Sequence, residues 1–79
     1  MLHAVEVDPN DIDRVDPSLS VMLFEEFTRP PAAGDILLVN NSSPPGENET
    51  GRSTGHVVRT APDYGLAWVK VDWDSMTWS

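Results

Sequence analysis

The chain has 79 residues, with thirteen acidic and five basic side chains and a formal net charge of −8 at pH 7. This length allows one domain with limited capacity to bury apolar surface. The absence of cysteine excludes disulfides and thiolate metal sites. No apolar run approaches the roughly 18 residues that span a bilayer, and residues 1–6 lack the charged start of a signal peptide. We therefore expect a cytoplasmic protein.

The acidic residues are concentrated near the N-terminus. Residues 1–26 hold seven of them against the single base Arg14, and these acids are Glu6, Asp8, Asp11, Asp13, Asp16, Glu25 and Glu26. The electrostatic field of so much negative charge repels nucleic acid and attracts basic protein surfaces. Acidity that only maintains solubility is the competing interpretation.

The first third of the chain predicts a strand followed by a helix. Residues 2–7 alternate as a strand does, and Asp8-Pro9 ends the run. Asp16-Pro17 is a typical helix start, and Pro30-Pro31 a typical end. The helical spacing i, i+3, i+4, i+8 between them is formed by Leu19, Met22, Leu23 and Phe27. A strand over residues 21–27 is the alternative.

The remaining chain predicts three strands. Residues 36–39 form a short apolar run after a turn at Gly34, and residues 56–60 form a second β-like run. Between them, residues 40–54 are almost entirely polar, which predicts a mobile loop. The clearest strand is residues 65–74, where period-2 alternation points Ala67, Val69, Val71 and Trp73 one way and Leu66, Trp68, Lys70 and Asp72 the other.

These elements predict a single α+β domain over 1–79. Its acidic strand and helix segment is 1–31, and an antiparallel meander with the mobile loop 40–54 follows over 32–79. The meander pattern Gly-Asp-x-Leu-x-Val, long loop, Gly-x-Val, turn, x-Val-x-Val-Asp-Trp resembles that of small SH3-like barrels over residues 34–73. The resemblance implies an SH3-like half-barrel with one short helix packed on it, as an alternative to an open antiparallel sheet covered by the helix.

No residue pattern indicates catalysis, a metal site or a cofactor. His3 and His56 lack neighbours at ligand spacing. Counted from Asp8, the aspartates fail the calcium-loop pattern because Ile12 occupies a ligand position. Residues 51–55 lack the lysine of a phosphate-binding loop.

Binding to another protein is the better hypothesis. In its size, its acidity and its lack of an enzyme motif, the chain resembles phage counter-defence proteins, including anti-CRISPRs that mimic nucleic acid. The resemblance implies an inhibitor, acting in the host cytoplasm, that blocks nucleic-acid access to a larger protein with a basic surface. It implies no direct contact with nucleic acid or membrane. From the residues themselves we expect partner contacts through Asp8, Asp11, Asp13, Asp16, Glu25, Glu26 and Trp68.

The alternative function is an SH3-like interaction module. It would bind a peptide, or assemble a larger complex, through Tyr64, Trp68 and the loop 40–54. A homodimer is compatible with either function, because the edge strands of a small sheet are usually paired or covered.

Overall fold

The computed structural model describes residues 1–7, 11–42 and 50–78. It contains six strands and three short 3-10 turns. The strands are β1 (Leu2–Glu6), β2 (Ser20–Leu23), β3 (Ile36–Ser42), β4 (Thr50–Ala61), β5 (Leu66–Val71) and β6 (Thr77–Trp78). The turns are η1 (Phe24–Glu26), η2 (Pro62–Tyr64) and η3 (Trp73–Ser75).

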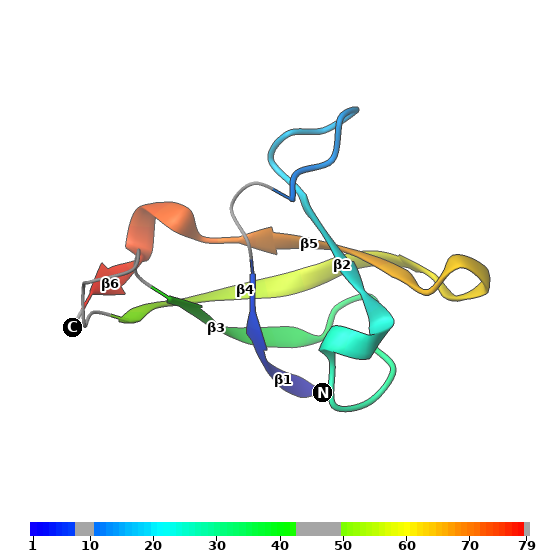
Figure 1. Ribbon diagram of the computed structural model, residues 1–79, viewed down its shortest axis with the longest axis horizontal. Coiled ribbons are helices and arrows are strands. Elements are labelled where there is room, and N and C mark those ends of the chain that lie inside the picture. Colours follow the sequence, from blue (N-terminus) through cyan, green and yellow to red (C-terminus); the bar gives the residue numbers. More distant parts are fainter. Residues whose placement is uncertain (8–10, 43–49, 79) are drawn as a thin grey trace.

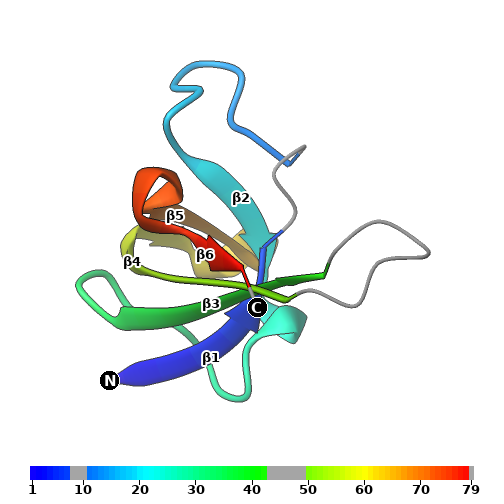
Figure 2. The same cartoon turned by 90° about the vertical axis from the view of Figure 1, so that its left-hand side faces the viewer.

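The strands form one mixed sheet in the order β1-β3-β4-β5-β2, with β6 paired to the start of β4. β1 runs parallel to β3, and the other pairs are antiparallel. The sheet curves strongly, so that its two outer strands, β1 and β2, lie on the same side of the central meander (Figures 1 and 2). His3 on β1 makes an edge contact with Phe27, which follows η1, with ring centroids 5.2 Å apart. This contact joins the two ends of the curved sheet.

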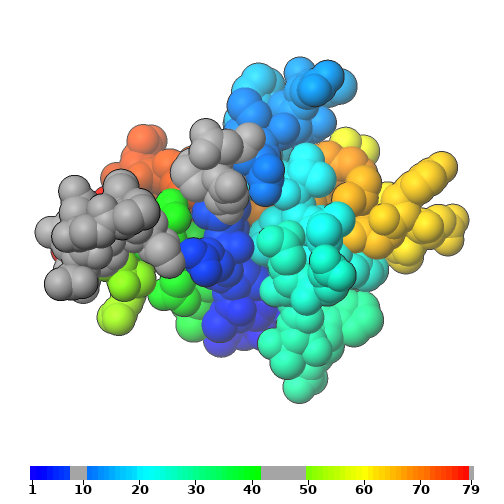
Figure 3. Space-filling model, viewed as in Figure 1, coloured from blue at the N-terminus to red at the C-terminus, as the bar shows by residue number. Residues whose placement is uncertain are grey.

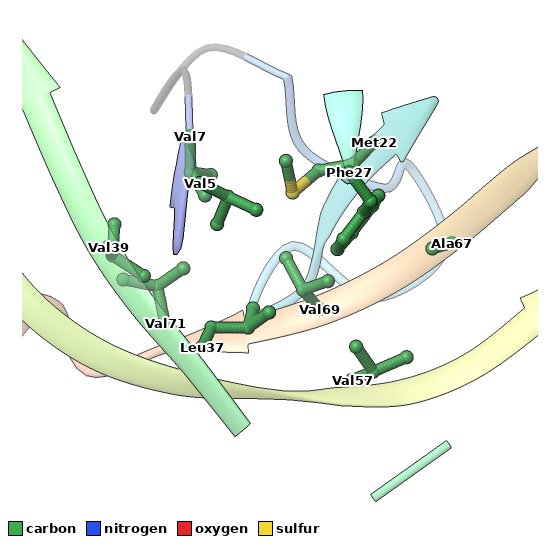
Figure 4. Close-up of a cluster of buried hydrophobic side chains, with 10 residues drawn as sticks. All are labelled: Val5, Val7, Met22, Phe27, Leu37, Val39, Val57, Ala67, Val69 and Val71. Atoms are coloured by element: carbon green, nitrogen blue, oxygen red, sulfur yellow. The ribbon is translucent and has the colours of Figure 1, made fainter. Parts of the chain in front are cut away.

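The core fills the concave side of the sheet (Figure 4). Alternate residues of each strand point into it, because successive side chains of a strand face opposite sides. Its members are Val5, Val7, Met22, Phe27, Leu37, Val39, Val57, Ala67, Val69 and Val71. The predicted inward face of residues 65–74 is confirmed at Ala67, Val69 and Val71, and Trp73 packs on the edge of the core from η3. Burial of each large apolar side chain in this core stabilises the folded state by roughly 1.5–3 kcal/mol.

The prediction of an α+β fold with a packed helix is wrong. In the described residues the segment that was expected to be helical is strand β2 followed by the single 3-10 turn η1. β2 pairs with β5, so Met22 faces the core, whereas Leu23 faces outward and is 46% exposed. A strand that ends in a turn buries Leu19, Met22 and Phe27 as well as a helix would. The strand alternative was therefore correct as far as Leu23.

The predicted loop over residues 40–54 is also shorter than expected. β3 continues through Ser42 and β4 begins at Thr50, with Asn40 opposite Arg52. Polar side chains do not prevent such pairing, because the backbone forms the ladder and these outward positions need no apolar cover. Residues 43–49 lie outside the described part of the chain. The strands predicted over residues 36–39 and 56–60 lie within β3 and β4, and the strand predicted over residues 2–7 is confirmed as far as Glu6.

A close backbone approach explains one glycine of β4. A side chain at Gly55 would place its Cβ 2.5 Å from the carbonyl oxygen of Lys70. The register between β4 and β5 also shifts nearby, between Val57 and Arg59. Separately, within the described residues no helix is long and apolar enough to cross a membrane.

Candidate functional site

The outer edge of β2 is covered by a hairpin that carries the aspartates. Val21 donates its N–H to the Asp11 carbonyl at 2.8 Å, and Asp13 donates its N–H to the Leu19 carbonyl at 2.9 Å. Ile12 forms the bridge to Ser20 between these two bonds. The short segment 11–13 therefore runs antiparallel to β2, and the chain reverses over residues 14–18.

The reversal is held by hydrogen bonds within the hairpin. Asp16 accepts hydrogen bonds from both the N–H and the hydroxyl of Ser18, at 3.1 and 2.6 Å, and its own N–H donates to the Asp13 carboxylate at 3.3 Å. The bonds from Ser18 lower the pKa of Asp16 because they favour its ionised form. Pro17 restricts the backbone between these residues. The hairpin thus has a defined shape, held at its turn by the Asp16 carboxylate.

Three acidic residues are aligned along this edge of β2. Asp13 is opposite Leu19 and Asp11 is opposite Val21, while Glu26 accepts the N–H of Leu23 at 2.7 Å. These three positions on β2 are two residues apart, which corresponds to steps of roughly 7 Å along a strand. We call Asp11, Asp13 and Glu26 the acidic row. The hairpin precedes β2 and η1 follows it (Figure 1), and both are visible on the face shown in Figure 3.

The acidic row borders a shallow depression of about 480 Å³. Asp11 and Glu26 lie on its wall together with Ile12, Arg14, Val21, Met22 and Leu23. Two of these, Ile12 and Leu23, are large exposed apolar side chains. The depression therefore offers carboxylates beside apolar surface, with one guanidinium at its border.

The remaining predicted acids lie near the two ends of the row. Asp16 is in the hairpin turn, where the nearby charge of Lys70 contributes to its lowered pKa. Glu25 is exposed on η1 and lines a second depression with Phe24 and Tyr64. Asp8 lies outside the described residues. Along this side of the molecule the order is therefore Asp16, Asp13, Asp11, Glu26 and Glu25.

Trp68 lies on the outer face of β5, but its ring is not free. It is opposite Val21 on one side and Arg59 on the other, and Val21 is in turn opposite Asp11. The Arg59 guanidinium stacks 4.0 Å from the ring centroid, in cation–π geometry. The Trp68 Nε1 atom is buried and has no hydrogen-bond partner. Trp68 therefore supports the surface beside the acidic row instead of projecting from it.

Three residues beside the row were not predicted from the sequence to belong to the site: Ile12, Arg14 and Leu23. Ile12 and Leu23 supply exposed apolar area, and Arg14 reduces the local charge. The alternation Asp11-Ile12-Asp13 is the one signal that points to them, since it places both aspartates on one side of an extended segment.

The histidines do not join this site. His3 is buried, and its Nε2 lies 2.8 Å from the Asp35 carboxylate, inside the fold. His56 is exposed on the outer face of β4. Among the described residues, no three His, Asp or Glu side chains converge as metal ligands do. The acidic row is accordingly an extended line of charge and not a chelating cluster.

The fold and the site define a small acidic domain, a curved mixed sheet with carboxylates along one edge. Comparison with protein-family models, with curated proteins and with solved structures found no match for the chain. The resemblances to SH3-like barrels and to phage counter-defence proteins therefore stay predictions.

Proposed function

We propose that this protein inhibits a larger protein by occupying its basic, nucleic-acid-binding surface. The observation that carries the proposal is the acidic row, three acidic residues aligned with alternate positions of β2, which are roughly 7 Å apart along the strand. Phosphates follow one another by about 3.4 Å along the axis of each DNA strand. Because the phosphates also wind around that axis, the straight-line distance between neighbours on one strand exceeds this rise, and the spacing of the row is on that scale.

The setting of the row favours this function over simple solubility. The carboxylates are attached to a hydrogen-bonded hairpin and to a capped turn, so little conformational entropy is lost when a partner binds. Ile12 and Leu23 beside them are exposed apolar groups. A partner that buries these groups gains contact area that a phosphate backbone would not supply.

The partner is a protein whose cationic cleft normally holds nucleic acid. A CRISPR effector is the example that we propose first, which would make this chain an anti-CRISPR acting in the host cytoplasm. The mechanism is stoichiometric: the row pairs with Lys and Arg side chains of the cleft, and nucleic acid is excluded while the complex lasts. Because the charges are exposed, the attraction weakens with salt.

The experiment removes the charge of the row and keeps its shape. The row variant carries Asp11→Asn, Asp13→Asn and Glu26→Gln, each of which retains a hydrogen-bond acceptor. The control variant carries Asp63→Asn, Asp72→Asn and Asp74→Asn, an equal change of charge at exposed positions elsewhere. Displacement of labelled duplex DNA from purified CRISPR effector complexes, at roughly 50 and 200 mM salt, is the measurement.

We expect the row variant to inhibit roughly tenfold less well or worse, since each exposed pair contributes up to about 1 kcal/mol. The control should inhibit as the native chain does, and higher salt should weaken all three. Failure of the native chain to displace DNA contradicts the choice of CRISPR effectors. Equal inhibition by the row variant and the native chain contradicts the role of the row.

A further inference from the structure

The outward sides of β1, β3 and β4 form a grid of nine exposed residues. Cross-strand pairing arranges them in three rows. The rows are Leu2–Ile36–His56, Ala4–Leu38–Thr54 and Glu6–Asn40–Arg52. Each of the nine is exposed, and Leu2, Ile36 and Leu38 remain 58%, 50% and 44% accessible. We call this set the outer grid.

The outer grid differs from the rest of the surface in charge and in apolar character. Glu6 and Arg52 are its two formally charged members, so the grid is neutral in a chain of net charge −8. Its centre is aliphatic. Large aliphatic side chains grouped on one uncovered sheet face are typical of an interaction surface. Small domains in particular gain buried area by association.

We propose that a second copy of this chain covers the outer grid. Two copies meet here without bringing their acidic hairpins together, because the hairpin of residues 11–18 projects from the opposite side of the molecule to β1 and β3 (Figure 2). A nucleic acid would leave the aliphatic groups unmatched, and a basic partner would be drawn to the acidic row instead. A second copy supplies equal aliphatic surface and no opposing charge.

A two-fold axis along β3 makes the contact complementary. Such an axis places β1 of one copy over β4 of the other and β3 over β3. Ile36 and Leu38 on β3 therefore each face the same residue of the second copy. In the third row it sets Glu6 opposite Arg52 of the second copy, twice in the dimer. Sheets that pack face to face keep their strands within about 30° of each other, which this axis allows. The dimer then carries two separate acidic rows.

The size of the grid predicts a weak dimer. Three strands about 4.8 Å apart and five residues long cover roughly 10 by 17 Å before the side chains are counted. Stable interfaces bury about 800 Å² on each partner. We therefore expect a monomer–dimer equilibrium in the micromolar range or weaker, and sedimentation must extend from low micromolar to millimolar protein.

The test is sedimentation velocity of the native chain and of two matched variants. Leu38→Asp should remain monomeric at all concentrations, because it buries a charge at the two-fold axis. Leu23→Asp introduces the same charge at a similarly exposed residue of β2, outside the grid, and should dimerise as the native chain does. Urea unfolding confirms that each variant is folded, and Ile36→Asp replaces Leu38→Asp if that variant is not.

A charge exchange tests the axis itself. Arg52→Glu places like charges opposite each other and should weaken the dimer at least about tenfold, and the double variant Glu6→Arg, Arg52→Glu should restore it. A native chain that stays monomeric at millimolar concentration overturns the proposal. Dissociation by Leu23→Asp as strong as by Leu38→Asp also overturns it, as does failure of the exchange to restore dimerisation. None of these outcomes depends on the proposed inhibitory function.

Discussion

Asp35 shows how one residue joins two parts of this fold. Its carboxylate accepts hydrogen bonds from His3 Nε2 at 2.8 Å, from the Ala32 N–H at 2.9 Å and from the Met1 amino group at 3.1 Å. Nε2 is the donor, because an ionised carboxylate only accepts. These bonds attach β1 to the turn that precedes β3. They lower the pKa of Asp35 from 3.8 to about 2, the bond from His3 contributing most.

Replacement of Asp35 by asparagine should change the pH dependence of stability. A carboxylate with a lowered pKa in the folded state stabilises the protein above its unfolded pKa, and this contribution is lost as the pH falls from about 4 to 2. Asp35→Asn should therefore be less stable than the native chain at pH 7, and the difference should shrink as the pH falls through that window. Urea unfolding at pH 7, 4 and 2.5 measures it. If the free energy of unfolding had the same pH dependence in both proteins, the ionised Asp35 carboxylate would not stabilise the fold through these three bonds.

At the scale of elements, β2 shows how neighbouring residues acquire opposite environments. Its pairing with β5 turns Met22 into the core, where it is 2% exposed, and leaves Leu23 on the surface. The outer edge of the strand is closed by Asp11, Asp13 and Glu26, which satisfy backbone groups that would otherwise be open. An edge strand protected in this way resists uncontrolled pairing with other chains.

The two adjacent residues should respond differently to truncation. Met22→Ala should lower the free energy of unfolding by roughly 2–5 kcal/mol, because it leaves a cavity in the core. Leu23→Ala should change it by about 1 kcal/mol or less, since about half of the residue is already exposed to water. Chemical denaturation of both variants is the measurement. Similar large losses would favour the rejected helix, in which both residues belong to one buried stripe.

For the whole molecule, the excess of negative charge should make stability depend on salt. Like charges along the acidic row and the hairpin repel each other in the folded state, and salt screens them with a Debye length of about 10 Å at 0.1 M. The free energy of unfolding in urea should therefore rise by a few tenths to about 1 kcal/mol when sodium chloride is raised from roughly 10 to 200 mM. The row variant should show a smaller increase. A decrease with salt would mean that attractive pairs outweigh this repulsion.

The strands could be predicted from the sequence because their signal is local. The alternation of residues 65–74 specifies an inward and an outward face whatever the partner strand is, and Ala67, Val69 and Val71 are buried accordingly. The excess of acidic residues near the N-terminus is likewise visible in the sequence. Composition and period-2 patterning thus determined a small, acidic, strand-rich domain.

The conformation of residues 19–27 and the form of the site were decided by tertiary structure. Apolar spacing there suits a helix and also a strand followed by a turn, and the available edge of β5 selects the strand. Asp13 and Glu26 are thirteen positions apart in the chain, and the pairing of residues 11–13 with β2 brings them into one row. Such alignment depends on backbone hydrogen bonds between distant segments, which no local pattern of side chains encodes.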